Sequence, residues 1–152
     1  MKPDFKLVDA SEIRMKYTDC PIFNVEMLSA RGTSLIDTTA KMNVTGHSLY
    51  KIFVEKGQRF EELNLHIGLA NGTRREEHIL MTDVDVLVEN RKISTTFLAM
   101  PHARNKYTLF GMDFIERAKI IINVPQRMWY FADDHESHEL NFENADEVLD
   151  VL

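Results

Sequence analysis

One aspartate stands out in this chain, because an apolar run typical of a β-strand delivers it directly into a turn. The run covers residues 34–36, and Asp37, Thr38 and Thr39 follow it. A carboxyl group there is poorly solvated on one side, and an acid in that setting can exchange protons in catalysis. Taken alone, an aspartate in such a turn is more often a turn or capping residue than a catalyst. Asp37 is therefore a candidate that needs support from other parts of the sequence.

Hydrolysis of a peptide bond by carboxyl groups sets a second condition. One acid activates a water molecule and another protonates the carbonyl oxygen, so a single carboxyl group is not enough. Two close carboxyl groups share a proton, because ionising both at short range is unfavourable. The chain supplies one candidate of this kind, so Asp37 needs a partner acid.

Two other segments accompany Asp37 along the chain. Residues 63–81 predict a β-hairpin, because alternating apolar side chains flank Asn71 and Gly72, a strong turn signal. A second apolar run, residues 107–115, contains the sequence Gly-Met-Asp that begins at Gly111, ahead of a short predicted helix. The order is an Asp-Thr turn, a glycine-containing hairpin, and an apolar-Gly-x-Asp segment before a helix.

This order resembles the retropepsin family, the dimeric aspartic proteases of retroviruses and retrotransposons. The resemblance covers about residues 20–131, and residues 69–73 look especially like the flap of gypsy-type retrotransposon enzymes. It implies an all-β fold, a closed β-barrel with one short helix and a flap hairpin. It also implies a homodimer, in which the second acid is Asp37 of another copy across a two-fold axis. The expected activity is that of an aspartic endopeptidase on a polypeptide substrate, with no cofactor or metal.

The resemblance assigns roles to the residues that match the family motif. Asp37 would be the general acid and base, Thr38 would form a hydrogen bond across the dimer, and Ala40 matches a position that is usually small. Gly111 and Asp113 would be structural, with the Asp113 carboxyl group bonding the start of the helix. Residues 66–78 would form a flap over the substrate; its named members are Gly68, Leu69, Ala70, Asn71 and Gly72.

Thr39 departs from the family motif, which has glycine at this position. A threonine keeps the backbone N–H group but adds a β-branched side chain that resists positive φ. If the position requires a positive φ, the strain is roughly 1–3 kcal/mol. If it only requires space, two Thr39 side chains would crowd the site of the catalytic water.

Two functions therefore remain open, together with a third reading of the fold. The intact pair of Asp37 and Thr38 favours an active endopeptidase, either a retrotransposon enzyme or a host protein derived from one. Thr39 favours a catalytically inactive module for dimerisation or peptide binding. An unrelated β-barrel binding module is the third possibility.

The remaining candidate groups favour structural roles. The histidines at positions 47, 66, 78 and 102 are scattered and are interpreted as surface or satisfied side chains. His135 and His138 are spaced one residue too closely for the zinc motif His-Glu-x-x-His. Cys20 is the one cysteine, which excludes an intrachain disulfide and favours a reducing compartment.

Composition and charge divide the chain into three parts. The 152 residues suit one domain, and 44% of them are hydrophobic. Eight of the 24 acidic residues lie in residues 132–152, which contain no Lys or Arg, so the rest carries 16 acids against 18 bases. We expect an arm at residues 1–19, a retropepsin-like domain at residues 20–131, and an acidic tail at residues 132–152 that is disordered and dispensable for folding.

The same features exclude several partners. No basic stripe interleaved with aromatic residues indicates a nucleic-acid surface. No apolar run approaches the roughly 18 residues of a membrane span. The first residues lack the apolar core of a signal peptide, so a cytoplasmic or nuclear location is expected.

Alternation of apolar residues predicts most of the strands. Strands are expected at residues 21–28, 84–88, 93–100, 120–124 and 127–131, and a helix at residues 112–119. Residues 30–33 are expected to form a turn, and residues 44–51 a short helix or a turn.

Overall fold

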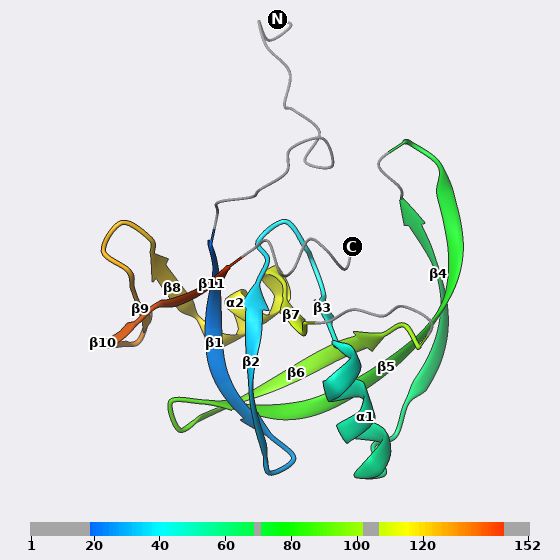
Figure 1. Cartoon of the computed structure of the whole chain (residues 1–152), viewed down its shortest axis with the longest axis horizontal. Helices are drawn as coiled ribbons and strands as arrows, with labels where there is room; N and C mark the ends of the chain where they lie inside the picture. Colours follow the sequence, from blue (N-terminus) through cyan, green and yellow to red (C-terminus); the bar gives the residue numbers. More distant parts are fainter. Residues whose placement is uncertain (1–18, 69–70, 102–106, 145–152) are drawn as a thin grey trace, which may run out of the picture.

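The computed structural model describes residues 19–68, 71–101 and 107–144, and these residues form an all-β fold with two short helices (Figure 1). The segment at residues 44–51, expected as a short helix or a turn, contributes the first helix, so the fold has one helix more than the resemblance implies. The elements are β1 (Asp19–Met27), β2 (Ala30–Ile36), β3 (Asn43–Val44), α1 (His47–Glu55), β4 (Glu61–Gly68), β5 (Arg74–Val88), β6 (Arg91–Ala99), β7 (Leu109–Phe110), α2 (Met112–Ala118), β8 (Ile120–Asn123), β9 (Met128–Phe131), β10 (Asp134–Glu139) and β11 (Asn141–Asn144).

Two sheets organise these strands. The larger has eight strands in the order β11-β1-β2-β7-β3-β6-β5-β4, and the smaller has the order β10-β9-β8. A further bridge joins Glu26 of β1 to Leu87 of β5, which are distant in that order. Most neighbours are antiparallel, but β7 pairs in parallel with β2, and β3 with β6. These parallel pairs bring together three parts of the sequence: the segment that contains β2 and β3, the strand β6, and the strand β7. Asp37 lies at the end of β2, in the first of these segments.

The first hairpin turns earlier than the sequence predicts. Leu28 and Ser29 have φ values of 49° and 62°, and they form the two-residue loop between β1 and β2. Two successive positive φ values match the turn that suits the twist of a tight hairpin. Residues 30–33, expected as a turn, are instead the first half of β2, because their backbone pairs with β1.

The long strand β5 joins the second half of the hairpin expected at residues 63–81, which ends in the run 78–81, to the strand expected at residues 84–88. Between these runs lies Thr82, which is buried, and its hydroxyl group donates a hydrogen bond of 2.7 Å to the Arg59 carbonyl group. Gln58 Nε2 in turn donates to the Thr82 hydroxyl oxygen, at 2.8 Å. Because the Thr82 hydroxyl group has both a donor and an acceptor partner, this polar residue can face the core, and the strand continues without a break. The alternation at residues 84–88 and 93–100 also indicates a strand pair with a polar turn at residues 89–92. The pair is present as a hairpin, but its turn is only Glu89 and Asn90, because β6 begins at Arg91.

Aromatic side chains fill the core between the sheet and the helices. Phe53 of α1 is fully buried and packs edge-on against Phe97, with ring centroids 5.8 Å apart. Phe110 and Phe114 stack at 3.8 Å, which fixes α2 against β7. The rings thereby connect both helices to the strands around Asp37.

The expectation of a disordered acidic tail is wrong for residues 134–144, and residues 145–152 lie outside the described residues. Residues 134–144 form β10 and β11, and β11 pairs with β1 from Asp19↔Asn144 to Ile22↔Asn141. Leu140 is 2% exposed and belongs to the core, and Phe142 packs against the core. Acidic residues dominate the composition, but the few apolar ones occupy core positions.

Polar and aromatic contacts also hold β10 to the body. Arg91 donates a hydrogen bond of 2.6 Å to Asp133 and lies 3.9 Å from the centroid of the Phe131 ring. The hydrogen bond from Arg91, together with its charge, lowers the pKa of the Asp133 carboxyl group. His138 packs on Trp129, with ring centroids 4.5 Å apart. The segment after residue 131 is therefore part of the folded domain, and of the expected arm only Asp19 lies within the described residues.

We predict that Leu140→Ala lowers the free energy of unfolding by about 2–5 kcal/mol, because it empties a buried site. Val54→Ala, at a residue that is 54% exposed on α1, is the control and should change it by less than about 0.5 kcal/mol. Urea denaturation followed by circular dichroism measures both. Equal effects would mean that residues 140–144 do not stabilise the fold.

Candidate active site

The backbone of Asp37 is fixed at the end of β2 by the neighbouring strand β7. Leu35 N–H donates to the Thr108 carbonyl group and Asp37 N–H to the Phe110 carbonyl group, each at 2.9 Å. The parallel register Leu35↔Leu109 continues to the residue before Asp37. Asp37 is half-buried, and the chain then leaves the sheet. An apolar strand thus presents one carboxyl group at the boundary between core and solvent, as the sequence predicts.

Thr39 binds the Asp37 carboxyl group within the same turn. Its backbone N–H donates a hydrogen bond of 3.0 Å to Asp37 Oδ1, and its hydroxyl group donates to the same oxygen. Among the described residues, none donates to Asp37 Oδ2. Thr38 is exposed, and its hydroxyl group bonds to no described residue, so the role expected for it across a dimer requires a second copy.

The expected backbone strain at Thr39 does not arise. Thr39 is absent from the described non-glycine residues with positive φ, so its β-branched side chain is compatible with the turn. Of the two reasons for glycine at this position, only the need for space remains.

The same local arrangement recurs at the tip of the β4–β5 hairpin. Thr73 N–H donates to Asn71 Oδ1 at 3.1 Å, and the Thr73 hydroxyl group donates to the same atom at 2.6 Å. An Asp or Asn that accepts from the backbone two residues later is a general turn motif. The contacts of Asp37 with Thr39 therefore explain the turn, and by themselves they are no evidence for catalysis.

Gly111 allows the loop after Asp37 to pack directly on the start of α2. A Cβ atom at Gly111 would lie 2.5 Å from the Met42 carbonyl oxygen and 2.7 Å from that of Ala40. The Met112 N–H group donates to the Ala40 carbonyl group at 2.8 Å. The Asp113 N–H group donates to the Lys41 carbonyl group at 2.9 Å. The loop therefore supplies acceptors to the helix start, and Gly111 supplies the space.

Asn43 is the residue of this site that sequence reasoning missed. Its side chain is fully buried; Oδ1 accepts from Gly111 N–H at 3.0 Å, and Nδ2 donates to the Thr96 carbonyl group and to Asp113 Oδ2. Asp113 Oδ1 accepts from Arg117 Nε at 3.1 Å. Asp113 therefore connects α2 to Asn43, and the expected bond from its side chain to the helix start is not formed. An isolated asparagine carries no sequence signal for this position.

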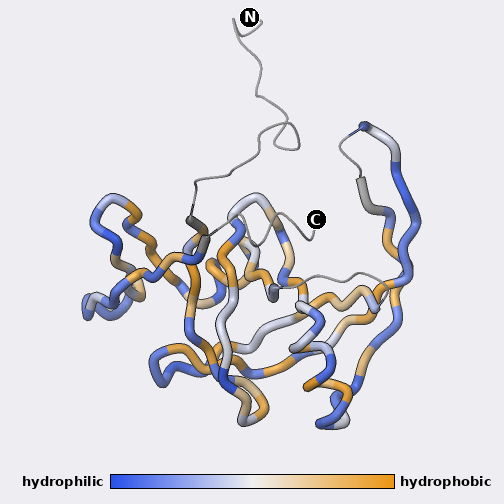
Figure 2. Tube along the Cα trace, viewed as in Figure 1, coloured by the Kyte–Doolittle hydropathy of each residue, from blue (hydrophilic) through white to orange (hydrophobic). Residues whose placement is uncertain are grey.

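The hairpin expected at residues 63–81 is present as β4 and the first half of β5. Its strands pair from Glu61↔Met81 to Gly68↔Arg74, and it extends away from the body as a ribbon (Figure 1). Figure 2 shows that hydrophilic residues predominate along its outer part. Gly72 has a φ of +84°, which favours glycine. The named residues Leu69 and Ala70 lie outside the described residues.

The other titratable groups do not converge on Asp37. His78 contacts Asn64 and Glu62 on the hairpin, His47 and His66 are exposed, and His102 lies outside the described residues. Within residues 19–68, 71–101 and 107–144, no group of His, Cys, Asp or Glu side chains is arranged to hold a metal ion. No helix in these ranges is long and apolar enough to cross a membrane.

A solved structure decides the fold class. No protein-family model and no curated protein sequence matches the chain. The retroviral protease-like domain of Ddi1 from Leishmania major superimposes with a TM-score of 0.57 at 11% identity, covering 83% of this chain and 95% of that domain. The fold is retropepsin-like. Sequence identity this low leaves the activity and the partners of the chain to be argued from its own residues.

We predict that Gly111→Ala destabilises the protein by about 1–3 kcal/mol, because the added Cβ atom meets backbone carbonyl groups that cannot rotate away. Gly32→Ala is the matched control, since a Cβ atom at Gly32 meets nothing within 4 Å. Thermal unfolding compares the two variants. Equal transition temperatures would contradict the close packing of the loop on Gly111.

Proposed function

We propose that the chain is an aspartic endopeptidase that acts as a homodimer, with Asp37 of each copy forming the catalytic pair. The observation that supports this most strongly is the position of Asp37. In a retropepsin-like fold, β7 bonds the Asp37 backbone and the start of α2 bonds the loop that follows, so the half-buried carboxyl group lies at the end of β2. The retropepsin-like sequence of residues 69–73 further suggests a retrotransposon origin.

The proposed chemistry follows from the properties of two close carboxyl groups. At mildly acidic pH such a pair holds one proton, so that one group can accept a proton from water while the other donates to the carbonyl oxygen of the substrate. Asp37 Oδ2 has no donor among the described residues and is the oxygen available to a second copy or to water. The fixed backbone around Asp37 would keep the pair in register without rearrangement.

The β4–β5 hairpin is the proposed flap. Its tip carries Gly72 at positive φ, and residues 64–66 and 71–76 of its outer part are exposed, so few contacts restrain this part. An extended substrate between the hairpin and the loop after Asp37 would find backbone donors and acceptors on both sides. This supports a polypeptide substrate over a small molecule.

Two exposed features suit a dimer interface near Asp37. Met112 is 37% exposed although its backbone is bonded to Ala40 in the loop that follows Asp37. The strand β11 is at the end of the eight-stranded sheet, so one of its edges pairs with no strand among the described residues. A second copy placed at the loop would cover the Met112 side chain.

The alternative is a catalytically inactive module for dimerisation or peptide binding, and the observation that favours it concerns Thr39. The Thr39 hydroxyl group adds a second donor to Asp37 Oδ1 and occupies space beside the carboxyl group. In a dimer two such side chains would lie next to the proposed pair. Reduced activity is expected, because Asp37 is intact but the Thr39 side chains obstruct the site.

We predict that the protein sediments as a dimer at micromolar concentration and that Met112→Glu shifts it toward monomer. A glutamate in the first turn of α2 suits the helix dipole, so the fold should persist. The control is Val54→Glu, which places a charge on α1 away from the loop. A folded wild-type monomer at high concentration would contradict the paired mechanism.

We predict weak or no peptide cleavage by the wild type at mildly acidic pH, and an increase of about tenfold or more in Thr39→Gly. A hydrogen bond to a charged group contributes about 1.5–3 kcal/mol, and each 1.4 kcal/mol in the barrier is about tenfold in rate. Asp37→Asn should abolish cleavage in either background. The control Thr39→Val keeps the branched side chain without the hydroxyl group, and so separates crowding from hydrogen bonding.

Two outcomes would count against parts of this proposal. Wild-type cleavage as fast as that of Thr39→Gly would show that Thr39 does not obstruct the site. A dimer in which neither protein cleaves would favour the inactive module.

A further inference from the structure

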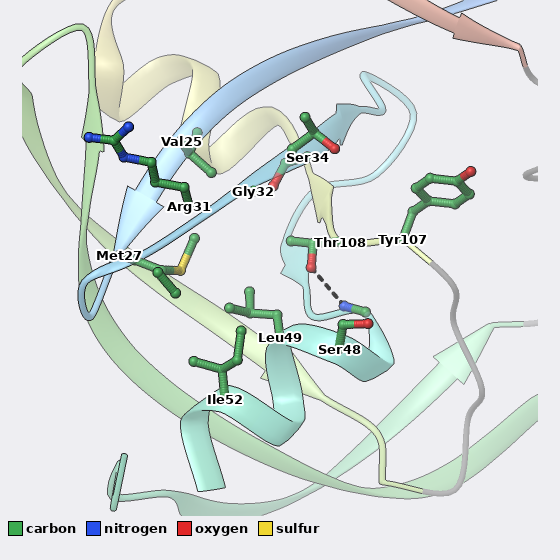
Figure 3. A pocket seen from close by; sticks show the side chains of 13 residues that line it. Val25, Met27, Arg31, Gly32, Ser34, Ser48, Leu49, Ile52, Tyr107 and Thr108 are labelled. Atoms are coloured by element: carbon green, nitrogen blue, oxygen red, sulfur yellow. Dashed lines mark hydrogen bonds between the residues drawn. The ribbon is translucent and has the colours of Figure 1, made fainter. Parts of the chain in front are cut away.

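A hollow of about 270 Å³ lies between the β1–β2 hairpin and α1 (Figure 3). Neither Asp37 nor a residue of β4 or β5 lines it. Its apolar wall consists of Val25 and Met27 from β1 and of Leu49 and Ile52 from α1. Pockets for small molecules usually measure about 300–1,000 Å³. The hollow is below that range, so it suits one or two side chains better than a complete small-molecule ligand.

The edge of β2 beside this hollow has backbone groups that pair with none of the described strands. Leu35 N–H points away from β1 to Thr108, and in a strand the groups of every second residue point the same way. The backbone groups of Arg31 and Thr33 therefore also point away from β1. The strand β7 pairs only with residues 35–36, so among the described residues no strand covers this part of the edge. Both residues are exposed.

Side chains along this edge alternate between the hollow and the outer face. Gly32 pairs with Val25, and Ser34 with Phe23, so these four positions share the inner face. Arg31 and the residue opposite it, Glu26, share the outer face. A Cβ atom at Gly32 would meet nothing within 4 Å, so the hollow opens directly in front of this residue.

Arg31 gives the edge a charge preference. It takes part in none of the ion pairs between described residues, although Glu26 is opposite it on β1. A strand added beside β2 would place one of its outer side chains next to Arg31, where opposite charge is favourable. Its inner side chains would point into the hollow between β1 and α1.

We propose that this edge of β2 binds an extended segment of another polypeptide, in which apolar residues alternate with acidic ones. The main chain of the segment would form hydrogen bonds with Arg31 and Thr33, in the manner of strand addition. An apolar side chain would fill the hollow, and an acidic side chain would lie beside Arg31. This second peptide site does not depend on the catalytic activity proposed for Asp37.

The alternating stretch at residues 13–17 of the same chain fits this site poorly. It carries Arg14 and Lys16, which have the same charge as Arg31.

The test uses the full chain with Asp37→Asn, so that no probe is cleaved. The probe is a fluorescein-labelled peptide, acetyl-Ser-Leu-Glu-Leu-Glu-Leu-Ser-amide, and fluorescence anisotropy measures its Kd. One control peptide has lysine in place of both glutamates, and another has proline at the central position. We expect the first control to bind at least fivefold more weakly, and the second at least tenfold.

Two matched pairs of variants locate the site. Gly32→Ile fills the hollow from its open side and should weaken binding at least tenfold, whereas Gly32→Ala should change it less than twofold. Thr33→Pro removes the outward N–H group without touching the β1 ladder and should also weaken binding at least tenfold, whereas Thr33→Val should retain it. In hydrogen exchange, the peptide should protect the Arg31 and Thr33 amides.

Several outcomes would overturn the proposal. Equal binding by Gly32→Ile and Gly32→Ala would exclude the hollow, provided that both variants unfold at the wild-type temperature. Protection confined to residues 37–40 and the β4–β5 hairpin would place the peptide in the proposed active site. Much tighter binding by chains that lack residues 1–18 or 145–152 would show that the chain's own ends occupy the edge.

Discussion

The close approach of two backbone segments at Gly111 is the constraint on which the candidate site depends. The loop after Asp37 passes within contact distance of the start of α2, and only a residue without a side chain leaves room for it. This contact buries backbone groups that must find partners, because an unpaired buried polar group is unfavourable. The fully buried side chain of Asn43 meets part of that need, since it bonds the backbone of both Gly111 and Thr96. The position of Asp37 follows from this packing.

The core explains why the segments around Asp37 have little freedom. Phe97 of β6 packs on Phe110 of β7, which stacks on Phe114 of α2. These core contacts fix β7, the strand that bonds the Asp37 backbone. Leu140, between β10 and β11, extends the same core. The segment at residues 134–144 docks on the body through β11, which pairs with β1, and adds buried apolar area that a small domain needs. Its acidic character is therefore compatible with folding, because acidic side chains occupy the outward positions.

Local structure at Asp37 does not by itself distinguish an enzyme from a turn. The bonds between Asp37 and Thr39 are repeated between Asn71 and Thr73, where an amide replaces the carboxyl group. The local sequence thus builds the turn in both places. What separates the two sites is their surroundings, because Asp37 is held by β7 at the edge of the core, whereas Asn71 is exposed at the end of a ribbon. Catalysis would require a second carboxyl group, which the turn cannot supply.

The sequence by itself determined the features that depend on neighbouring residues. Regular alternation predicted the β5–β6 hairpin, the Asn71-Gly72 turn signal predicted the β4–β5 hairpin, and the apolar run into Asp37 predicted the end of β2. Only the tertiary structure decided that residues 30–33 continue β2, that Thr82 joins two runs into one strand, and that Leu140 enters the core. It also decided the role of Asn43. In each of these cases the deciding partner is distant in sequence, so local propensity carries no information about the contact that overrides it.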